Sequence, residues 1–185
     1  MKIKVLKDHV AWEGEWSRVI ERDFIGVHGE REVYEVHVRK THGPVAIIIP
    51  VTAAGELIFI KHFRIPRKEF VLETPAGIMD IKGENPAALA RRELLEETGY
   101  RARGMKLVAK TANNAGLMND NYYFFVATGC EKIADPDLES AEEIETILVP
   151  LKKVEAFISQ RRNFSVAAPL YGIPFFLKKA GIKLL

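Results

Sequence analysis

Hydrophobic and polar residues alternate in short runs through the first 40 residues of the chain, most clearly at 19–24 and 33–38. Alternation with a period of two favours strands with one exposed face, and the His28-Gly29 pair between these runs favours a turn. The next apolar run, 45–51, is rich in β-branched residues, which suit a buried central strand. We therefore predict a small antiparallel hairpin sheet at the N-terminus, followed by the first strand of a second sheet.

The pattern changes to that of a helix at 86–98. Asn85 suits the N-cap, Pro86 suits the first helical position because no N–H is needed there, and Gly99 suits a left-handed C-terminal stop. Further strands are predicted near 56–61, 70–74, 105–110, 122–127 and 144–149, and helical patterns occur at 151–162 and 167–179. Together these elements predict one unit of helices and strands over residues 41–185, with residues 1–40 as an N-terminal β-sheet extension.

Composition and charge narrow the function classes. The 185 residues are 48% hydrophobic and 28% charged, and 27 Lys and Arg face 25 Asp and Glu, which leaves no broad positive field for nucleic acid. The N-terminus lacks the apolar stretch of a secretory signal, and the run 45–51 is too short to span a bilayer. Cys130 is the only cysteine, so no intrachain disulfide can form. We therefore expect a cytoplasmic protein with no nucleic-acid or membrane partner.

The predicted helix carries three acidic residues on one side. With about 3.6 residues per turn, Glu93 and Glu97 lie one above the other and Glu96 lies to their side, between two apolar strips. Carboxylate oxygens with room for water suit Mg²⁺ or Mn²⁺, with a substrate phosphate completing the shell. The alternative is a solvated helix whose acids pair with Arg91 and Arg92. The helix alone leaves both interpretations open.

A longer motif around the helix favours the metal site. Residues 77–100 read G-x6-E-x7-R-E-L-L-E-E-T-G-Y, which resembles the Nudix box, G-x5-E-x7-R-E-U-x-E-E-x-G-U with U apolar. The one departure is an extra residue between Gly77 and Glu84. Because that segment only connects a corner to the helix, we expect the insertion to be absorbed without moving the glutamates.

The resemblance extends to the ADP-ribose and nucleoside-diphosphate-sugar pyrophosphatase branch of this family, through His-Phe-Arg at 62–64, Leu-Glu-Thr-Pro-Ala-Gly at 72–77 and a late acidic loop. It implies an α+β fold, an α/β/α sandwich around a mixed sheet. It also implies a homodimer built with the N-terminal sheet. The implied activity is Mg²⁺-dependent hydrolysis, in which Mn²⁺ can substitute, of a nucleotide sugar such as ADP-ribose to a nucleoside monophosphate and a sugar phosphate.

The resemblance also assigns roles to individual positions. The implied metal ligands are the Ala76 carbonyl, Glu93, Glu96 and Glu97. The implied substrate-binding residues are Arg64 and Glu73. We also expect Trp16 to bind substrate, as one of several aromatic residues of the N-terminal sheet that could offer a stacking face to the base or sugar. The residues implied to support the site are Gly77, Glu84, Arg92 and Gly99.

The general base and the substrate stay open at this stage. We expect the base to be Glu142 or Glu143 in the late acidic loop, with Glu96 as the alternative. ADP-ribose hydrolases tend to have a proline where this chain has Ala115, which weakens a narrow assignment to ADP-ribose. Another diphosphate, such as a dinucleotide or coenzyme A, is a second hypothesis, and a nucleotide sensor without catalysis is a third. The intact acids of the box argue against the sensor.

Overall fold

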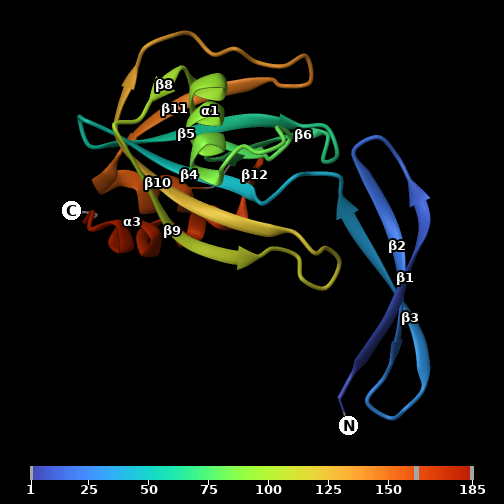
Figure 1. Ribbon diagram of the computed structural model, residues 1–185. Helices are drawn as coiled ribbons and strands as arrows, with labels where there is room; N and C mark the ends of the chain where they lie inside the picture. The colour runs from blue at the N-terminus through green and yellow to red at the C-terminus, as the bar shows by residue number, and fades with distance from the viewer. Residues whose placement is uncertain (1, 161–162, 184–185) are drawn as a thin grey trace.

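The computed structural model describes residues 2–160 and 163–183, which form an N-terminal sheet and a larger body (Figure 1). The N-terminal sheet is antiparallel and consists of β1 (Lys4–Glu13), β2 (Ser17–Ile25) and β3 (Arg31–Arg39). Figure 1 shows it standing to one side of the body as a blue arm. It buries few side chains, and every residue of β1 is exposed. The alternation over the first 40 residues therefore does form a hairpin sheet, but one with little core of its own.

The body is built on a second sheet, which has nine strands within the described residues. These strands are β4 (Val45–Thr52), β5 (Glu56–Arg64), β6 (Glu69–Glu73), β7 (Ala76–Ile78), β8 (Tyr100–Arg101), β9 (Gly104–Ala112), β10 (Asn121–Lys132), β11 (Ile144–Pro150) and β12 (Ser165–Val166). Their order is β12-β6-β5-β4-β10-β8, while β11 pairs with β5, β7 with β4 and β9 with β10. The β4–β10 and β6–β12 pairs are parallel and the others antiparallel, so the sheet is mixed.

Helix α1 (Pro86–Thr98) has the predicted bounds for the predicted reasons. The Asn85 side chain accepts hydrogen bonds from the N–H groups of Ala87 and Ala88, at 3.0 and 2.9 Å. Gly99 adopts φ 74° and donates its N–H to the Leu95 carbonyl, which ends the helix in the left-handed conformation. No helix in the described residues is long and apolar enough to cross a membrane.

The two later helical patterns form shorter helices than predicted. The first becomes a 3-10 turn (Leu151–Lys153) and α2 (Val154–Ser159), and the end of its predicted range, 161–162, lies outside the described residues. The second becomes a 3-10 turn (Ala168–Gly172) followed by α3 (Ile173–Ala180). Pro174 sits in the first turn of α3, where its missing N–H costs nothing, so the proline begins a helix instead of interrupting one.

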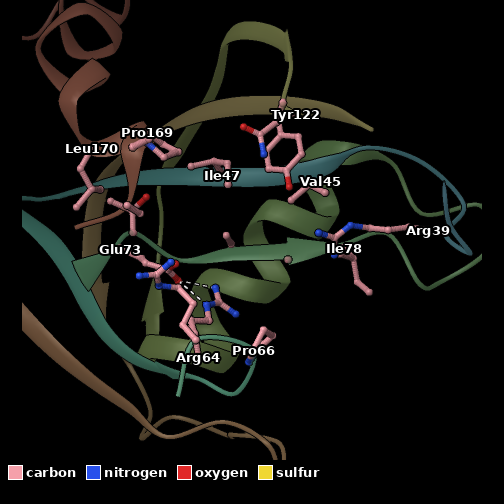
Figure 2. Close-up of a pocket in the computed structure, with 17 residues that line it drawn as sticks. Arg39, Val45, Ile47, Arg64, Pro66, Glu73, Ile78, Tyr122, Pro169 and Leu170 are labelled. Atoms are coloured by element: carbon pink, nitrogen blue, oxygen red, sulfur yellow. Dashed lines mark hydrogen bonds and ion pairs between the residues drawn. The ribbon is translucent and has the colours of Figure 1, made fainter. Parts of the chain in front are cut away.

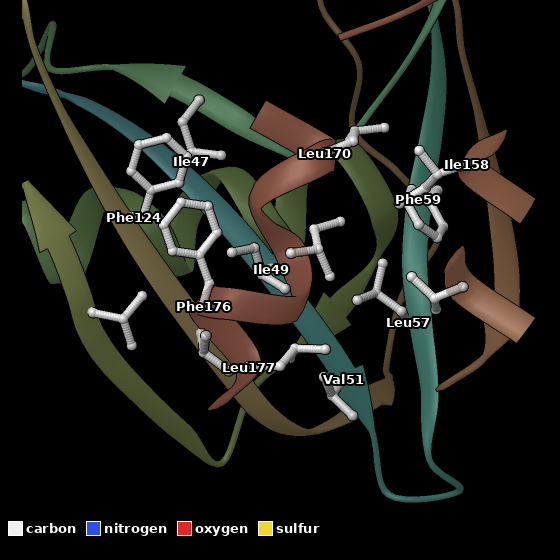
Figure 3. Packing of buried hydrophobic residues seen from close by; sticks show 14 of the residues in the cluster. Ile47, Ile49, Val51, Leu57, Phe59, Phe124, Ile158, Leu170, Phe176 and Leu177 are labelled. Atoms are coloured by element: carbon white, nitrogen blue, oxygen red, sulfur yellow. The ribbon is translucent and has the colours of Figure 1, made fainter. Parts of the chain in front are cut away.

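The body has three layers, with α1 on one face of the sheet and α2 and α3 on the other (Figure 1). Leu89 and Leu94 of α1 are fully buried with Ile48 and Ile58 of the sheet. On the opposite face, the rings of Phe124 and Phe176 stack with centroids 4.5 Å apart (Figure 3). Full burial of such side chains stabilises the fold by about 1.5–3 kcal/mol each. This α/β/α sandwich around a mixed sheet confirms the expected α+β fold class.

Candidate active site

A cavity of about 540 Å³ lies beside the acidic side of α1. Glu93, Glu96 and Glu97 line it, together with the short strand β7. The approach of helix and strand depends on Gly77, because a Cβ at this position would lie 2.0 Å from the carboxyl carbon of Glu93. The glycine of the motif therefore lets the strand and the carboxylate share one wall of the cavity.

Glu97 lines this cavity and is nearly buried, with 2% of the residue exposed. Its Oε2 accepts a hydrogen bond from the Ala76 N–H at 3.1 Å. Burial raises the pKa of Glu97 well above its ordinary value, and the negative charge of Glu93 raises it further. The helical pattern placed the three acids on one side of the helix, and packing of the helix against the body buries Glu97 among them.

Arg92 links the helix to the loop that precedes it. Its Nη1 lies 3.0 Å from carboxylate oxygens of Glu93 and of Glu96. Its Nε lies 3.2 Å from Glu84, and its Nη2 lies 2.9 Å from Asp80. Burial raises the pKa of Glu93 to about 7 even though Arg92 opposes the shift. Glu84 contacts Arg92 and is not among the residues that line the cavity.

The donor chemistry of this wall fits a hard divalent cation. Glu93, Glu96 and Glu97 offer carboxylate oxygens, and burial of Glu93 and Glu97 penalises their negative charges unless a cation compensates them. Within residues 2–160 and 163–183, no group of three Asp, Glu, His or Cys side chains lies close enough together to hold a metal ion. Arg92 occupies the space between Glu93 and Glu96, so an ion would have to replace it as their partner.

A second cavity, of about 590 Å³, is shown in Figure 2 and shares lining residues with the first. The two cavities share Arg39, Arg64 and the strand β7 as common walls. Arg64 donates from Nε and Nη2 to Glu73 Oε2, at 2.9 and 2.5 Å, which fixes its guanidinium between the cavities (Figure 2). Glu73 thus orients Arg64 and lines the second cavity.

The structure separates the two candidates for the general base. Glu142 lines the cavity beside α1, called the acidic cavity below. Its Oε2 accepts the N–H of Glu139 at 2.9 Å, and its negative charge raises the pKa of Glu93. Glu143 is exposed and contributes only its backbone carbonyl, which accepts the N–H of Phe63 at 3.0 Å. Of the two candidates, only Glu142 is among the described residues that line the cavity.

Two further predicted residues, Trp16 and Gly99, also differ in whether they line the cavity. Trp16, in the turn between β1 and β2, lines the acidic cavity although 70% of it is exposed. Gly99 does not line a cavity; it ends α1, where an added Cβ would lie 2.0 Å from the Ala134 carbonyl oxygen.

Sequence reasoning missed Arg39, the last residue of β3, which lines both cavities. Its Nε donates to Asp120 Oδ2 at 2.7 Å. In the sequence Arg39 is one of several charged residues in an alternating pattern, so no local signal distinguishes it. Asp137 and Glu139 of the late loop also line the acidic cavity, and the acidic composition of that loop was the available signal.

Comparison with known proteins gives several relatives. The chain is 28% identical over 143 residues to an ADP-ribose pyrophosphatase of Bacillus subtilis, which covers 77% of this chain and 76% of that protein. It is 29% identical over 196 residues to an ADP-sugar pyrophosphatase of Mus musculus, which covers 97% and 89%. A methanol dehydrogenase activator of Bacillus methanolicus is 29% identical over 124 residues, or 66% of each chain.

The fold and the family agree with these relatives. The crystal structure of an ADP compounds hydrolase matches with a TM-score of 0.78 at 21% identity, over 98% of this chain and 97% of that one. Residues 41–168 match the NUDIX domain, and this range contains α1, β7 and the late acidic loop. The glutamates beside the cavity, the three-layer fold and this match lead to one conclusion: the chain belongs to the NUDIX family and is a NUDIX hydrolase.

Proposed function

We propose that this protein is a Mg²⁺-dependent pyrophosphohydrolase that cleaves the diphosphate of ADP-ribose or a related nucleotide sugar. The observation that carries the proposal is the pair of adjoining cavities, one lined by Glu93, Glu96 and Glu97 and both lined by Arg39 and Arg64. Carboxylates suit a divalent cation and arginines suit phosphate oxygens, so a diphosphate fits the junction between them. The relatives named as ADP-ribose and ADP-sugar pyrophosphatases support the same substrate class.

Hydrolases of this family work with a divalent metal, and we assign its ligands to Glu93, Glu96, Glu97 and the Ala76 carbonyl. When bound, the cation neutralises charge that develops on the phosphate oxygens. Mg²⁺ is the proposed ion because all these ligands are oxygen atoms, and Mn²⁺ can replace it for the same reason.

The side chains around the cavity then have distinct tasks. Glu142 accepts a proton from the attacking water, whose oxygen bonds to phosphorus while the bond to the bridging oxygen breaks. Arg64, fixed by Glu73, pairs with the diphosphate, and Trp16 offers an aromatic surface to the nucleoside. Glu96 is the alternative base because its side chain is 40% exposed, whereas that of Glu93 is 13% exposed and Glu97 is buried. The products are a nucleoside monophosphate and a sugar phosphate.

A product-resolved screen tests this function. The purified protein is incubated with Mg²⁺ and a panel of ADP-ribose, other nucleotide sugars, dinucleotides and coenzyme A. We expect ADP-ribose or another nucleotide sugar to give the highest kcat/KM, with AMP and ribose 5-phosphate as the products from ADP-ribose. Preference for a dinucleotide or coenzyme A would replace the substrate class. Tight binding without turnover of any compound would favour a nucleotide sensor.

We also propose that the protein is a homodimer assembled through residues 1–40, with residues 41–185 as the hydrolase unit. The N-terminal sheet exposes Val5, Val10 and Trp12, each more than half accessible, and three strands cannot bury both of their faces alone. Sedimentation equilibrium at micromolar concentration should give twice the chain mass, and a monomer would exclude the assembly.

The buried, unpaired Cys130 fits a reducing compartment, so we include a cytoplasmic location in the proposal.

A further inference from the structure

Two arginines stand where the two cavities meet, and they are anchored differently. Arg64 belongs to β5 and is held within the body by Glu73 of β6. Arg39 belongs to the N-terminal sheet, and yet it lines both cavities of the body. Figure 2 shows it among the residues of the second cavity. The position of Arg39 at the site therefore depends on how the N-terminal sheet is attached to the body.

Asp120, at the end of the β9–β10 loop, makes the direct contact to Arg39. Its Oδ2 accepts the Arg39 Nε–H at 2.7 Å, and its side chain is only 9% exposed. An ionic hydrogen bond of this length and burial is among the stronger side-chain contacts. Because it uses Nε, the two terminal amino groups of the guanidinium keep their N–H donors for a ligand.

Other contacts between the same loop and β3 do not involve Arg39. The Tyr34 hydroxyl donates to the Gly116 carbonyl at 2.6 Å, and the His37 N–H donates to the Leu117 carbonyl at 2.8 Å. The loop therefore fastens the sheet at several points, and Asp120 is the point that reaches the arginine. Tyr34 provides a matched control, since its bond joins the same two segments without touching Arg39.

We propose that Asp120 is a positioning residue for substrate binding, which holds Arg39 at the junction of the two cavities so that its guanidinium meets the diphosphate of the substrate. The inference rests on the function proposed above. A guanidinium already fixed at Nε loses less conformational freedom when it binds an anion, so the contact favours binding. Since the diphosphate is present before and during hydrolysis, loss of this contact weakens both states and appears mainly in KM.

The test compares Asp120→Asn with Tyr34→Phe in the full chain, using steady-state kinetics with ADP-ribose and Mg²⁺. We expect Asp120→Asn to raise KM at least tenfold and to change kcat less than twofold. Tyr34→Phe should leave both constants within twofold of wild type. Arg39→Gln should raise KM by a similar factor, and adding Asp120→Asn to it should have no further effect. Asp120→Glu, which keeps the carboxylate, should restore most of the wild-type KM.

Several results would overturn the inference. Equal increases in KM for Asp120→Asn and Tyr34→Phe would mean that the loop only fastens the sheet. If the increases in KM caused by Asp120→Asn and Arg39→Gln multiply in the double variant, Asp120 does not act through Arg39. If Asp120→Asn does not fold, Arg39→Lys is used instead, because lysine keeps the positive charge but lacks the planar guanidinium with its separate Nε and terminal amino groups. An unchanged KM for Arg39→Lys would contradict the inference. Wild-type protein that hydrolyses no nucleotide sugar refutes the proposed function itself, and this inference with it.

Discussion

Glu97→Gln tests the acidic wall of the cavity most directly. The substitution keeps the shape of a side chain that is 2% exposed, and the Gln oxygen can still accept the Ala76 N–H now bonded at 3.1 Å. It removes a buried negative charge from the wall of the cavity, next to Glu93. If that charge helps to hold the cation, turnover of ADP-ribose with Mg²⁺ should fall at least about 100-fold. A factor of 100 corresponds to about 2.7 kcal/mol of activation free energy, a plausible share of metal electrostatics.

The same variant should behave differently in thermal unfolding. Without metal its Tm should equal or exceed that of wild type, because the buried charge and its repulsion by Glu93 disappear. With Mg²⁺ at 100 times its Kd, wild type should gain about 2.7 kcal/mol of stability by linkage, and the variant should gain much less. Glu139→Gln, an exposed acid at the same cavity, is the control and should match wild type in both assays.

Two results would refute this reasoning. The first is near wild-type turnover by the double variant Glu93→Gln with Glu97→Gln, which would mean that these glutamates do not hold the metal. An equal Mg²⁺-dependent increase in Tm for wild type and Glu97→Gln would show that the cation binds elsewhere. Circular dichroism of each variant separates these outcomes from simple unfolding, since α1 should remain intact.

Three further predictions concern other parts of the molecule. Glu142→Gln should lower kcat at least about 100-fold at saturating Mg²⁺ and leave the Mg²⁺ Kd nearly unchanged, whereas Glu143→Gln should be mild; wild-type turnover in both variants and their double would make Glu96 the base. Burial and the nearby Arg64 lower the pKa of His62 from 6.5 to about 4, so this histidine takes up a proton in the unfolded chain before it does so in the fold. Its own contribution to stability should therefore fall by up to about 3 kcal/mol between pH 6.5 and pH 4. Urea unfolding of wild type and His62→Gln at several pH values checks this, and equal pH dependence would contradict it. Deletion of residues 2–40 should give a monomeric or aggregating protein in which α1 is intact and the KM for nucleotide sugar is greatly raised. A well-folded monomer with an unchanged KM would contradict this prediction.

Local chemistry along the chain was sufficient to predict helix α1. Asn85, Pro86 and Gly99 fix the ends of α1 through contacts within a few residues, so its bounds could be predicted without knowledge of the rest of the fold. The helical period then placed Glu93, Glu96 and Glu97 together, and the same three acids line one cavity in the structure. The spacing of the motif likewise identified the family.

Other features depended on segments that are distant in sequence. Glu97 is buried because β7 packs against α1, and a helical pattern cannot reveal what covers it. Glu142 and Glu143 are neighbours of the same type, and pairing of the strand that follows them with β5 decides which one faces the cavity. Arg39 lines the site next to Asp120, which lies 81 residues away in the sequence and accepts its Nε–H. Short-range propensities and caps act within one or two turns of chain, whereas burial, cavity walls and long-range ion pairs arise only when the sheets and helices pack together.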